Sequence, residues 1–240
     1  MKFLREKFLE DFKIERKFFD KRTLLAIFKL MNKGYVDRVE SLVKEGKESC
    51  VLSAKDKSNN WIALKVYRTE HCDFKNMWKY LIADPRFFGI KKDRRSVVYA
   101  WCRREFKNLK IAFKAKVACP KPIAFFENVL VMSFVGENGK PAPRLVDVIL
   151  SKEDASLIYK KIIQEVKKLV SFKLVHTDLS AFNILLFDKP YLIDFSQAVT
   201  FAHPLAKYFL IRDLKNINLY FKKLGVRVKD EERLFKELIP

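Results

Sequence analysis

One stretch of sequence decides the fold of this chain: Val175-His176-Thr177-Asp178-Leu179-Ser180-Ala181-Phe182-Asn183-Ile184-Leu185-Leu186. It has the frame H-x-D-L-x-x-x-N and runs directly into an apolar segment. A second motif, Ile193-Asp194-Phe195-Ser196, places an Asp eleven residues after Asn183. An isolated Asp before an apolar run is usually a cap or turn residue, so the interpretation rests on the joint order and spacing.

Phosphoryl transfer needs oxygen groups in two roles, and the two motifs supply both. One carboxylate orients or deprotonates the acceptor, which suits Asp178. Further oxygens hold Mg²⁺ against a triphosphate, which suits Asn183 and Asp194. The frame matches the catalytic loop and the metal-binding Asp of protein kinases, and a short hairpin would set both metal ligands at one end of two adjacent strands. We expect His176 to position this loop and not to carry a proton.

A strand in the first half of the chain supplies a matching cation. Residues 61–67 have the pattern of a strand, and Ile62-Ala63-Leu64-Lys65 fits the V-A-I-K pattern of a phosphate-binding Lys. Glu105 lies on the apolar face of a helix, where an unpaired carboxylate is costly. We therefore expect Lys65 and Glu105 to pair. In the alternative, Glu105 lies at the edge of the apolar stripe and reaches water.

The nucleotide loop is expected just before this strand, within residues 42–51. No G-x-G-x-x-G pattern occurs in the chain, and this segment holds a single glycine, Gly46. A loop with one glycine cannot wrap its backbone around phosphates as a Gly-rich loop does. We expect Lys47 and Ser49 to contact phosphates instead, the alternative being a polar turn that binds nothing.

Composition excludes several other classes of protein. The 240 residues carry 49 Lys+Arg against 29 Asp+Glu, a formal net charge of +20, and 49% are hydrophobic, too many for a disordered basic tail. The sequence shows no transmembrane run and no signal peptide, and its four widely spaced Cys read as reduced cytosolic thiols. The charge alone fits a polyanionic partner and a Lys-rich, heat-adapted surface equally well.

Local patterns give a strand-rich first half and a helix-rich second half, with a break rich in Gly and Pro at residues 136–143. Strands are expected within residues 39–67, and hairpins at 123–135 and 184–193. Clefts between two such lobes are common small-molecule sites. The expected helices are Thr23 to Asn32, Ser96 to Lys116, one capped by Ser151 that runs to about Phe172, and Pro204 to Lys223.

With these motifs in place, the chain resembles the RIO atypical protein kinases, of the RIO-one type that lacks an N-terminal winged helix. The resemblance covers nearly all of residues 20–225. General kinases share only the frame of Asp178, Asn183 and Asp194, so other segments make the match specific. These segments are 20–24, 30–34, Gly46-Lys47-Glu48, Lys65-Val66-Tyr67-Arg68-Thr69, 73–80, 105–109, Pro141-Ala142-Pro143-Arg144-Leu145, 194–199 and 208–213.

The resemblance implies an α+β fold, bilobal and protein-kinase-like, with a strand-rich N-lobe and a helical C-lobe. Three parts are expected: a basic N-terminal extension at residues 1–20, an N-lobe with its first helix at 21–134, and a C-lobe at 135–240. The usual activation segment and substrate lobe would be absent, and no A-P-E follows Asp194.

The resemblance also implies ATP with Mg²⁺, or with Mn²⁺ in its place, as ligands. Residues 131–136 match the hinge of the family, where main-chain groups of Ser133 and Val135 would contact adenine and Met132 would back its pocket. Asp178 and Asp194 would be catalytic, because Asp194 is similar to the Asp proposed in the family to accept phosphate transiently. The remaining ligand contacts would come from Lys47, Ser49, Lys65, Glu105 and, for the metal, Asn183 and Asp194.

Family members act in late maturation of the small ribosomal subunit. The resemblance therefore implies a serine/threonine kinase and ATPase with pre-ribosomal RNA as its partner, cytoplasmic, away from membranes, and monomeric. Two alternatives stay open. One is a small-molecule or tRNA-modification-associated kinase with the same frame, and the other is a degenerate pseudokinase that only docks on RNA.

The chain departs from the family pattern at three places. Lys44-Glu45 stand where the family has Ser-Thr before Gly46, Thr177 stands where Gly is usual, and Ala181-Phe182 replace Glu-Tyr. None of these changes removes a predicted catalytic or metal-binding residue. We expect activity to be retained, with nucleotide affinity as the property that changes.

Overall fold

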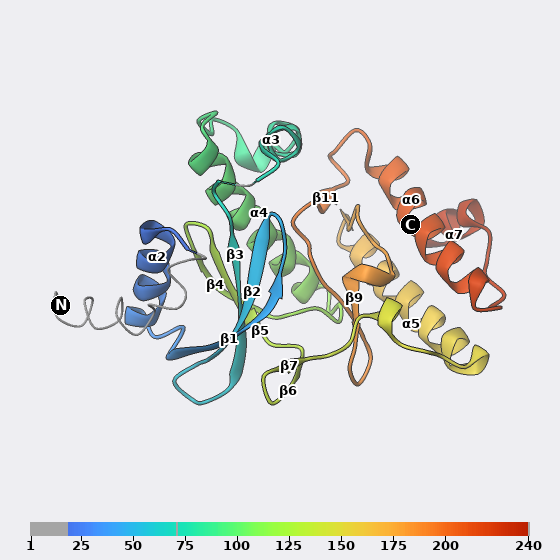
Figure 1. The fold of residues 1–240 in the computed structure, drawn as a ribbon. Helices are drawn as coiled ribbons and strands as arrows, with labels where there is room; N and C mark the ends of the chain where they lie inside the picture. Colours follow the sequence, from blue (N-terminus) through green and yellow to red (C-terminus); the bar gives the residue numbers. More distant parts are fainter. Residues whose placement is uncertain (1–18, 71, 240) are drawn as a thin grey trace. The chain divides into compact units, whose positions relative to one another are not determined.

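The computed structural model describes residues 19–70 and 72–239, which form two compact units (Figure 1). The first unit holds the described residues up to Arg104 together with Pro122–Phe134. The second holds Glu105–Lys121 and the described chain from Val135 onward. A five-stranded sheet dominates the first unit and helices dominate the second, so the chain is α+β, as the sequence predicts.

The first unit is built on an antiparallel sheet with the strand order β1-β2-β3-β5-β4. The register pairs Lys65 with Val51 on one side and with Leu130 on the other. Directly paired residues point to the same face of a sheet, so this register decides which side chains can act together. The strands are β1 (Arg38–Glu45), β2 (Ser49–Lys55), β3 (Trp61–Tyr67), β4 (Pro122–Phe126) and β5 (Val129–Ser133).

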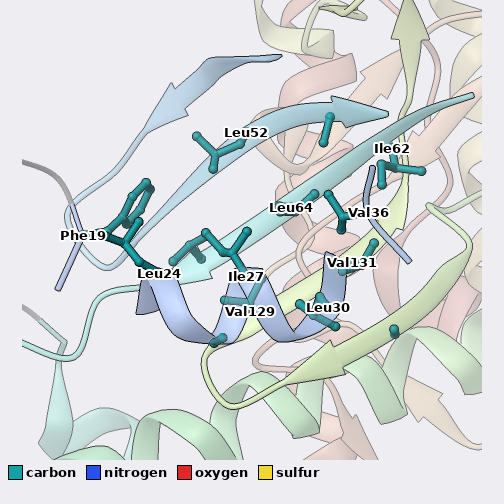
Figure 2. Packing of buried hydrophobic residues seen from close by; sticks show 14 of the residues in the cluster. Phe19, Leu24, Ile27, Leu30, Val36, Leu52, Ile62, Leu64, Val129 and Val131 are labelled. Carbon is teal, nitrogen blue, oxygen red and sulfur yellow. The ribbon is translucent and has the colours of Figure 1, made fainter. Parts of the chain in front are cut away.

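Helix α2 (Lys21–Asn32) covers one face of this sheet. The Asp20 carboxylate accepts the backbone N–H of Thr23 at 2.7 Å, so the helix begins two residues before its predicted start at Thr23. Burying this apolar interface stabilises the unit by about 25 cal/mol per Å² and leaves the opposite face of the sheet for other contacts. Figure 2 shows the buried side chains, among them Leu24, Ile27, Leu30, Leu52, Leu64, Val129 and Val131.

The first unit also contains α3 (Phe74–Ile82), the 3-10 turn η2 (Pro85–Phe87) and the first half of α4 (Arg94–Lys114). Arg104 on α4 is fully buried, and its Nε lies 3.3 Å from the Asp84 carboxylate. Arg86 contacts the same carboxylate at 2.6 Å. Burial lowers the pKa of Arg104 to about 10, and the paired Asp84 offsets part of this cost.

The second unit packs helices around three short antiparallel strand pairs, β6–β7, β8–β11 and β9–β10. A buried hydrogen bond of 2.8 Å from Tyr159 Oη to Asn218 Oδ1 joins the two longest helices of this unit. Its elements after α4 are β6 (Gly136–Glu137), β7 (Lys140–Pro141), η3 (Leu145–Asp147), α5 (Lys152–Ser171), β8 (Leu174–Val175), η4 (Ala181–Asn183), β9 (Ile184–Leu186), β10 (Pro190–Leu192), β11 (Val199–Thr200), α6 (Ala206–Lys223) and α7 (Glu231–Leu238).

Two local features of the second unit follow from its sequence. Ser151 caps α5 by accepting the Asp154 N–H at 3.0 Å, which confirms the predicted helix start, and its hydroxyl donates to the Asp154 carboxylate at 2.7 Å. The predicted break at residues 136–143 is a tight β6–β7 hairpin, in which Gly136 has a φ of 146°. A Cβ on Gly136 would lie 2.2 Å from the Lys140 carbonyl oxygen, so only glycine fits there. None of the helices in residues 19–70 and 72–239 combines the length and apolar composition needed to cross a membrane.

Candidate active site

The predicted catalytic loop is held together by a direct bond between two of its candidate residues. Asn183 Nδ2 donates to the Asp178 carboxylate at 2.9 Å and to the Asp178 carbonyl oxygen at 2.8 Å. The two donor hydrogens of the amide are therefore used within the loop, and its oxygen is the atom that can bind a metal. This contact fixes the Asp178 side chain relative to Asn183.

The backbone on both sides of Asp178 is anchored by α6. The buried Asp213 carboxylate accepts the N–H of Thr177 at 2.7 Å and the N–H of Leu179 at 3.1 Å. Arg212 donates to the Thr177 carbonyl oxygen from the same helix. Burial raises the pKa of Asp213 to about 7, although both backbone bonds favour the ionised form.

Thr177 adopts a backbone conformation that is unusual for its residue type. Its φ is 68°, in the left-handed region where a β-branched residue is strained. The side chain is fully buried, and its Oγ1 has no hydrogen-bond partner among the described residues. The family's usual Gly at this position has a physical reason, since glycine adopts this φ without strain.

Asp194 follows the β9–β10 hairpin, which the sequence predicts between Asn183 and Asp194 and the structure confirms. Ile193 N–H donates to the Asn183 carbonyl oxygen at 3.0 Å, so Asn183 and the residue preceding Asp194 are directly joined. Asp194 has a φ of 64°, and its Oδ1 accepts the Ser196 hydroxyl at 2.7 Å. The hairpin therefore brings two of the predicted site residues to one end of the strand pair.

Two further side chains hold the backbone on either side of Asp194. His176 Nε2 lies 2.9 Å from the Ile193 carbonyl oxygen, which fits the positioning role expected for it. Asn108, fully buried on the second half of α4, donates to the Phe195 carbonyl oxygen at 2.9 Å and to that of Ala198 at 2.8 Å. Buried carbonyl groups need such partners, so Asn108 specifies the path of this turn.

The electrostatics of the loop favour a weakly acidic Asp178. Partial burial, and then the negative charge of Asp194, raise the pKa of Asp178 above its usual range. The hydrogen bond from Asn183 and the charge of Arg212 oppose this rise. A raised pKa brings a carboxylate closer to the range in which it can accept a proton from a hydroxyl group.

The residues present fit a magnesium ion. Mg²⁺ prefers oxygen ligands and is usually bound by one or two carboxylates together with water and substrate phosphates. The Asn183 amide oxygen and the Asp194 carboxylate are such ligands. The repulsion between Asp178 and Asp194 that is visible in the pKa of Asp178 is the kind that a divalent cation relieves.

In the first unit, the predicted ligand-binding side chains lie on one face of the sheet. Lys65 and Tyr67 alternate with the buried Leu64 and Val66, and Lys65 Nζ lies 5.2 Å from the Tyr67 ring centre. Ser49 pairs with Tyr67, so it shares the face of Lys65. Met132 pairs with Ala63, which places it on that face as well. This face is opposite to the one that α2 covers.

The expected nucleotide loop is the tight turn between β1 and β2. Gly46 N–H donates to the Ser49 carbonyl oxygen at 2.9 Å, and a Cβ on Gly46 would lie 2.9 Å from that same oxygen. Glycine is therefore required by a close backbone approach. Lys47 is exposed in this turn, and Ser49 begins β2 beside it.

The remaining predicted residues lie near the division between the two units. Glu105 is buried on α4, as its place in the apolar stripe predicts, and its pairing with Lys65 stays a prediction. Ser133 ends β5, and Val135 follows two residues later. The Val135 carbonyl oxygen accepts the Ala142 N–H at 3.0 Å, so its own N–H is the group we expect to contact a base.

Sequence reasoning missed Asp213, Arg212 and Asn108 as functional residues. Asp213 and Asn108 are polar residues on the buried faces of amphipathic helices: buried Leu210 lies three residues before Asp213, and buried Ala112 lies four residues after Asn108. A polar side chain in such a position needs a buried partner, and that is the signal that could have revealed them.

Comparisons with known proteins agree with this geometry. A family model described as the RIO domain matches residues 50–234. The RIO-type serine/threonine-protein kinase Rio1 of Methanocaldococcus jannaschii is 45% identical over 92% of this chain and 75% of its own length. Rio1 of Haloferax volcanii is 40% identical over 92% of this chain and 76% of its length. Human serine/threonine-protein kinase RIO1 is 36% identical over 90% of this chain, which spans 39% of the human protein.

A solved structure shares the fold. The Rio2 kinase of Chaetomium thermophilum, in an ADP/Mg²⁺-phosphoaspartate complex, superposes with a TM-score of 0.69 at 23% sequence identity. The superposition covers 89% of this chain and 65% of that one. At this identity the likeness supports the kinase-like α+β fold.

Proposed function

The chain belongs to the Rio1 family of RIO-type protein kinases, and from that premise we propose that it is an ATP- and Mg²⁺-dependent serine/threonine kinase and ATPase. The observation that carries the proposal is the arrangement around Asp178. Asn183 binds the Asp178 carboxylate, and the Asn183 carbonyl oxygen accepts the N–H of the residue before Asp194. Hydrogen bonds within one unit thus join Asp178 to Asn183, and Asn183 to the residue that precedes Asp194.

In this proposal, the residues of the frame have separate roles. Asp178 orients the acceptor hydroxyl, or a water molecule, and its raised pKa favours uptake of the acceptor proton. The Asn183 amide oxygen and Asp194 hold the metal. Bound Mg²⁺ would neutralise phosphate charge as it develops.

The first unit would bind the nucleotide. Lys65, with Glu105 as its proposed partner, would hold the phosphates, and Lys47 and Ser49 would add contacts from the β1–β2 turn. Met132 shares the sheet face of Lys65, which suits the expected contact with the base. Main-chain groups of Ser133 and Val135 would bind adenine. We propose that the N-lobe spans residues 21–134 and that the C-lobe spans residues 135–240.

We further propose that Asp194 accepts the phosphoryl group during ATP hydrolysis. A carboxylate oxygen of Asp194 would form a bond to the γ-phosphorus as the bond to the departing ADP oxygen breaks. Water would then attack the same phosphorus, releasing inorganic phosphate and restoring the carboxylate. A phosphoenzyme that hydroxylamine cleaves, and that Asp194→Asn does not form, is the expected result.

For the partner, we propose RNA of the maturing small ribosomal subunit. The net charge of +20 exceeds what binding one nucleotide requires, and a polyanion accounts for the remainder. Pelleting with small-subunit precursors at increasing salt tests this part independently of catalysis.

The central experiment is ATP turnover with and without Mg²⁺. We expect Asp178→Asn to lower the rate by roughly 10²- to 10⁴-fold, as loss of a general base does. Asp188→Asn, an exposed Asp of the same unit, serves as the matched control and should retain the wild-type rate. Equal rates for wild type and Asp178→Asn would overturn the assignment.

A further inference from the structure

A pocket of about 520 Å³ lies in the second unit, at the C-terminal end of α4. None of the residues that line it belongs to the predicted catalytic or nucleotide-binding set. Four lysines from three separate segments line it: Lys114 at the end of α4 and Lys116 just after it, Lys168 from α5, and Lys189 from the β9–β10 turn.

The floor of this pocket is fixed by a buried network. Glu165 Oε2 accepts the Ala118 N–H at 2.8 Å, while its Oε1 binds Lys168 Nζ at 2.7 Å. Lys168 Nζ also donates to the Lys116 carbonyl oxygen at 3.1 Å. Both oxygens of the one carboxylate in the pocket are therefore occupied, and Lys168 is neutralised by it.

Three positive charges remain uncompensated at the rim. Lys114, Lys116 and Lys189 are exposed, and no carboxylate in residues 19–70 and 72–239 forms an ion pair with them. The partial negative charge at the C-terminal end of α4 favours a lysine nearby, which explains the presence of Lys114 or Lys116. It does not account for Lys189, which comes from a turn more than seventy residues further along the chain.

The walls of the pocket are apolar. Val117 and Ala118 form part of the lining, together with Phe113, which is 46% exposed. Lysine stems add apolar surface while their ammonium groups stay in water. An aromatic ring beside three ammonium groups suits a ligand with both a flat ring and a phosphate.

We propose that this pocket binds a nucleotide unit of single-stranded RNA, with a base on Phe113 and phosphates on Lys114, Lys116 and Lys189. The inference rests on the RNA partner proposed above and locates one of its contacts. The exposure of all three lysines and of Phe113 favours a strand that continues across the basic surface over a free nucleotide enclosed on every side.

The test compares two double variants that remove the same charge. Lys114→Gln/Lys189→Gln changes the pocket, and Lys215→Gln/Lys223→Gln changes two exposed lysines of α6 that lie outside it. Binding of a fluorescein-labelled 12-nucleotide RNA is measured by anisotropy from 50 to 200 mM salt. We expect the pocket variant to bind about tenfold more weakly and to lower the salt slope by about 1.4, since each phosphate contact contributes about 0.7. The α6 variant should change affinity less than twofold.

A second variant tests the stacking contact, and two readouts separate this inference from the proposed function. Phe113→Ala should weaken RNA binding roughly tenfold with little change in the salt slope. All variants should keep the wild-type thermal midpoint and the wild-type rate of ATP turnover. Equal RNA affinity of the two lysine variants would overturn the inference. Competition by UMP as effective as that by unlabelled RNA would overturn it as well. Neither result would affect the catalytic assignment. Loss of ATP turnover in wild type would affect only the proposed function.

Discussion

The carboxylate of Asp213 holds the backbone on both sides of Asp178. It accepts the N–H groups of Thr177 at 2.7 Å and Leu179 at 3.1 Å, and it does so from a buried position on α6. A loop that bears a candidate base must keep that base in place while a substrate binds. The two hydrogen bonds to Asp213 provide this rigidity. Because burial raises the pKa of its carboxyl group, the stability of the protein should depend on pH.

The first prediction concerns that pH dependence. Because burial raises the pKa of Asp213 to about 7, the folded state keeps a proton there between about pH 4 and 7 while the unfolded state does not. This group therefore makes the free energy of unfolding fall as pH rises through that range, by up to about 1.4 kcal/mol per pH unit, and has no effect on the slope above it. Asp213→Asn should lack this contribution.

Urea unfolding of wild type and Asp213→Asn at pH 5, 6, 7 and 8 measures the difference directly. The stability of wild type relative to the variant should decrease from pH 5 to 7 and then level off. A relative stability that stays constant over the same interval would show that Asp213 is ionised throughout.

The second prediction concerns the strained Thr177. Thr177→Gly should raise the free energy of unfolding by about 1 kcal/mol, because it relieves a left-handed φ of 68° and removes a buried hydroxyl without a partner. Thr177→Ala removes the hydroxyl but keeps most of the strain, so its effect should be smaller. Chemical denaturation checks both, and a Thr177→Gly protein less stable than wild type would contradict the strain.

The third prediction concerns the turn after Asp194. Asn108→Ala leaves the carbonyl groups of Phe195 and Ala198 without their donor, which should cost roughly 2 to 4 kcal/mol of unfolding free energy. Asn216→Ala is the matched control, since its single bond to Leu179 is long at 3.4 Å and only partly buried. Similar losses in the two variants would show that Asn108 has no special role.

The fourth prediction concerns the hydrogen bond from Asn183 to Asp178. That bond lowers the pKa of Asp178, so Asn183→Ala should let it rise further. The acidic limb of the pH profile of kcat should move to higher pH, because Asp178 must be ionised to accept a proton. An acidic limb that stays in place or moves to lower pH would contradict the role of the bond.

Much of the fold followed from local sequence signals. The Ser151 cap and the strand pattern of residues 61–67 placed α5 and β3 correctly. Helix α4 is shifted from the predicted 96–116 to Arg94–Lys114, because Asp93 accepts the Ser96 N–H at its start and Lys116 adopts a φ of 57° after its end. The predicted final helix begins at Ala206 instead of Pro204.

Other elements and contacts could not be predicted from the sequence, and each has a physical reason. Helix α3 lies within the family segment 73–80, and its nine residues span too few turns for their apolar periodicity to identify a helix by itself. Helix α7 is only eight residues long. Its N-cap is Asp230, whose side chain accepts the N–H groups of Glu232 and Arg233, and the sequence alone does not distinguish this Asp from others. Thr177 and Asp213 meet across 36 residues, and such a pairing depends on tertiary packing that no local pattern encodes.

The proposed catalytic residues can be named from the sequence because their spacing is specific. The sequence alone does not reveal the hydrogen bond from the Asn183 amide to the Asp178 carboxylate, through which we expect the two residues to act together. Residues that act as one unit show strongly non-additive effects when they are removed, whereas independent residues show effects that multiply.

The most direct test of this account is therefore Mg²⁺-dependent ATP turnover by Asp178→Asn, Asn183→Ala and the double variant. Each single variant should lose roughly 10²-fold or more in kcat. We predict that the double variant is no more than about threefold slower than the slower single variant, because either change already disables the shared unit. Losses that multiply in the double variant, or a single variant with the wild-type rate, would contradict the account.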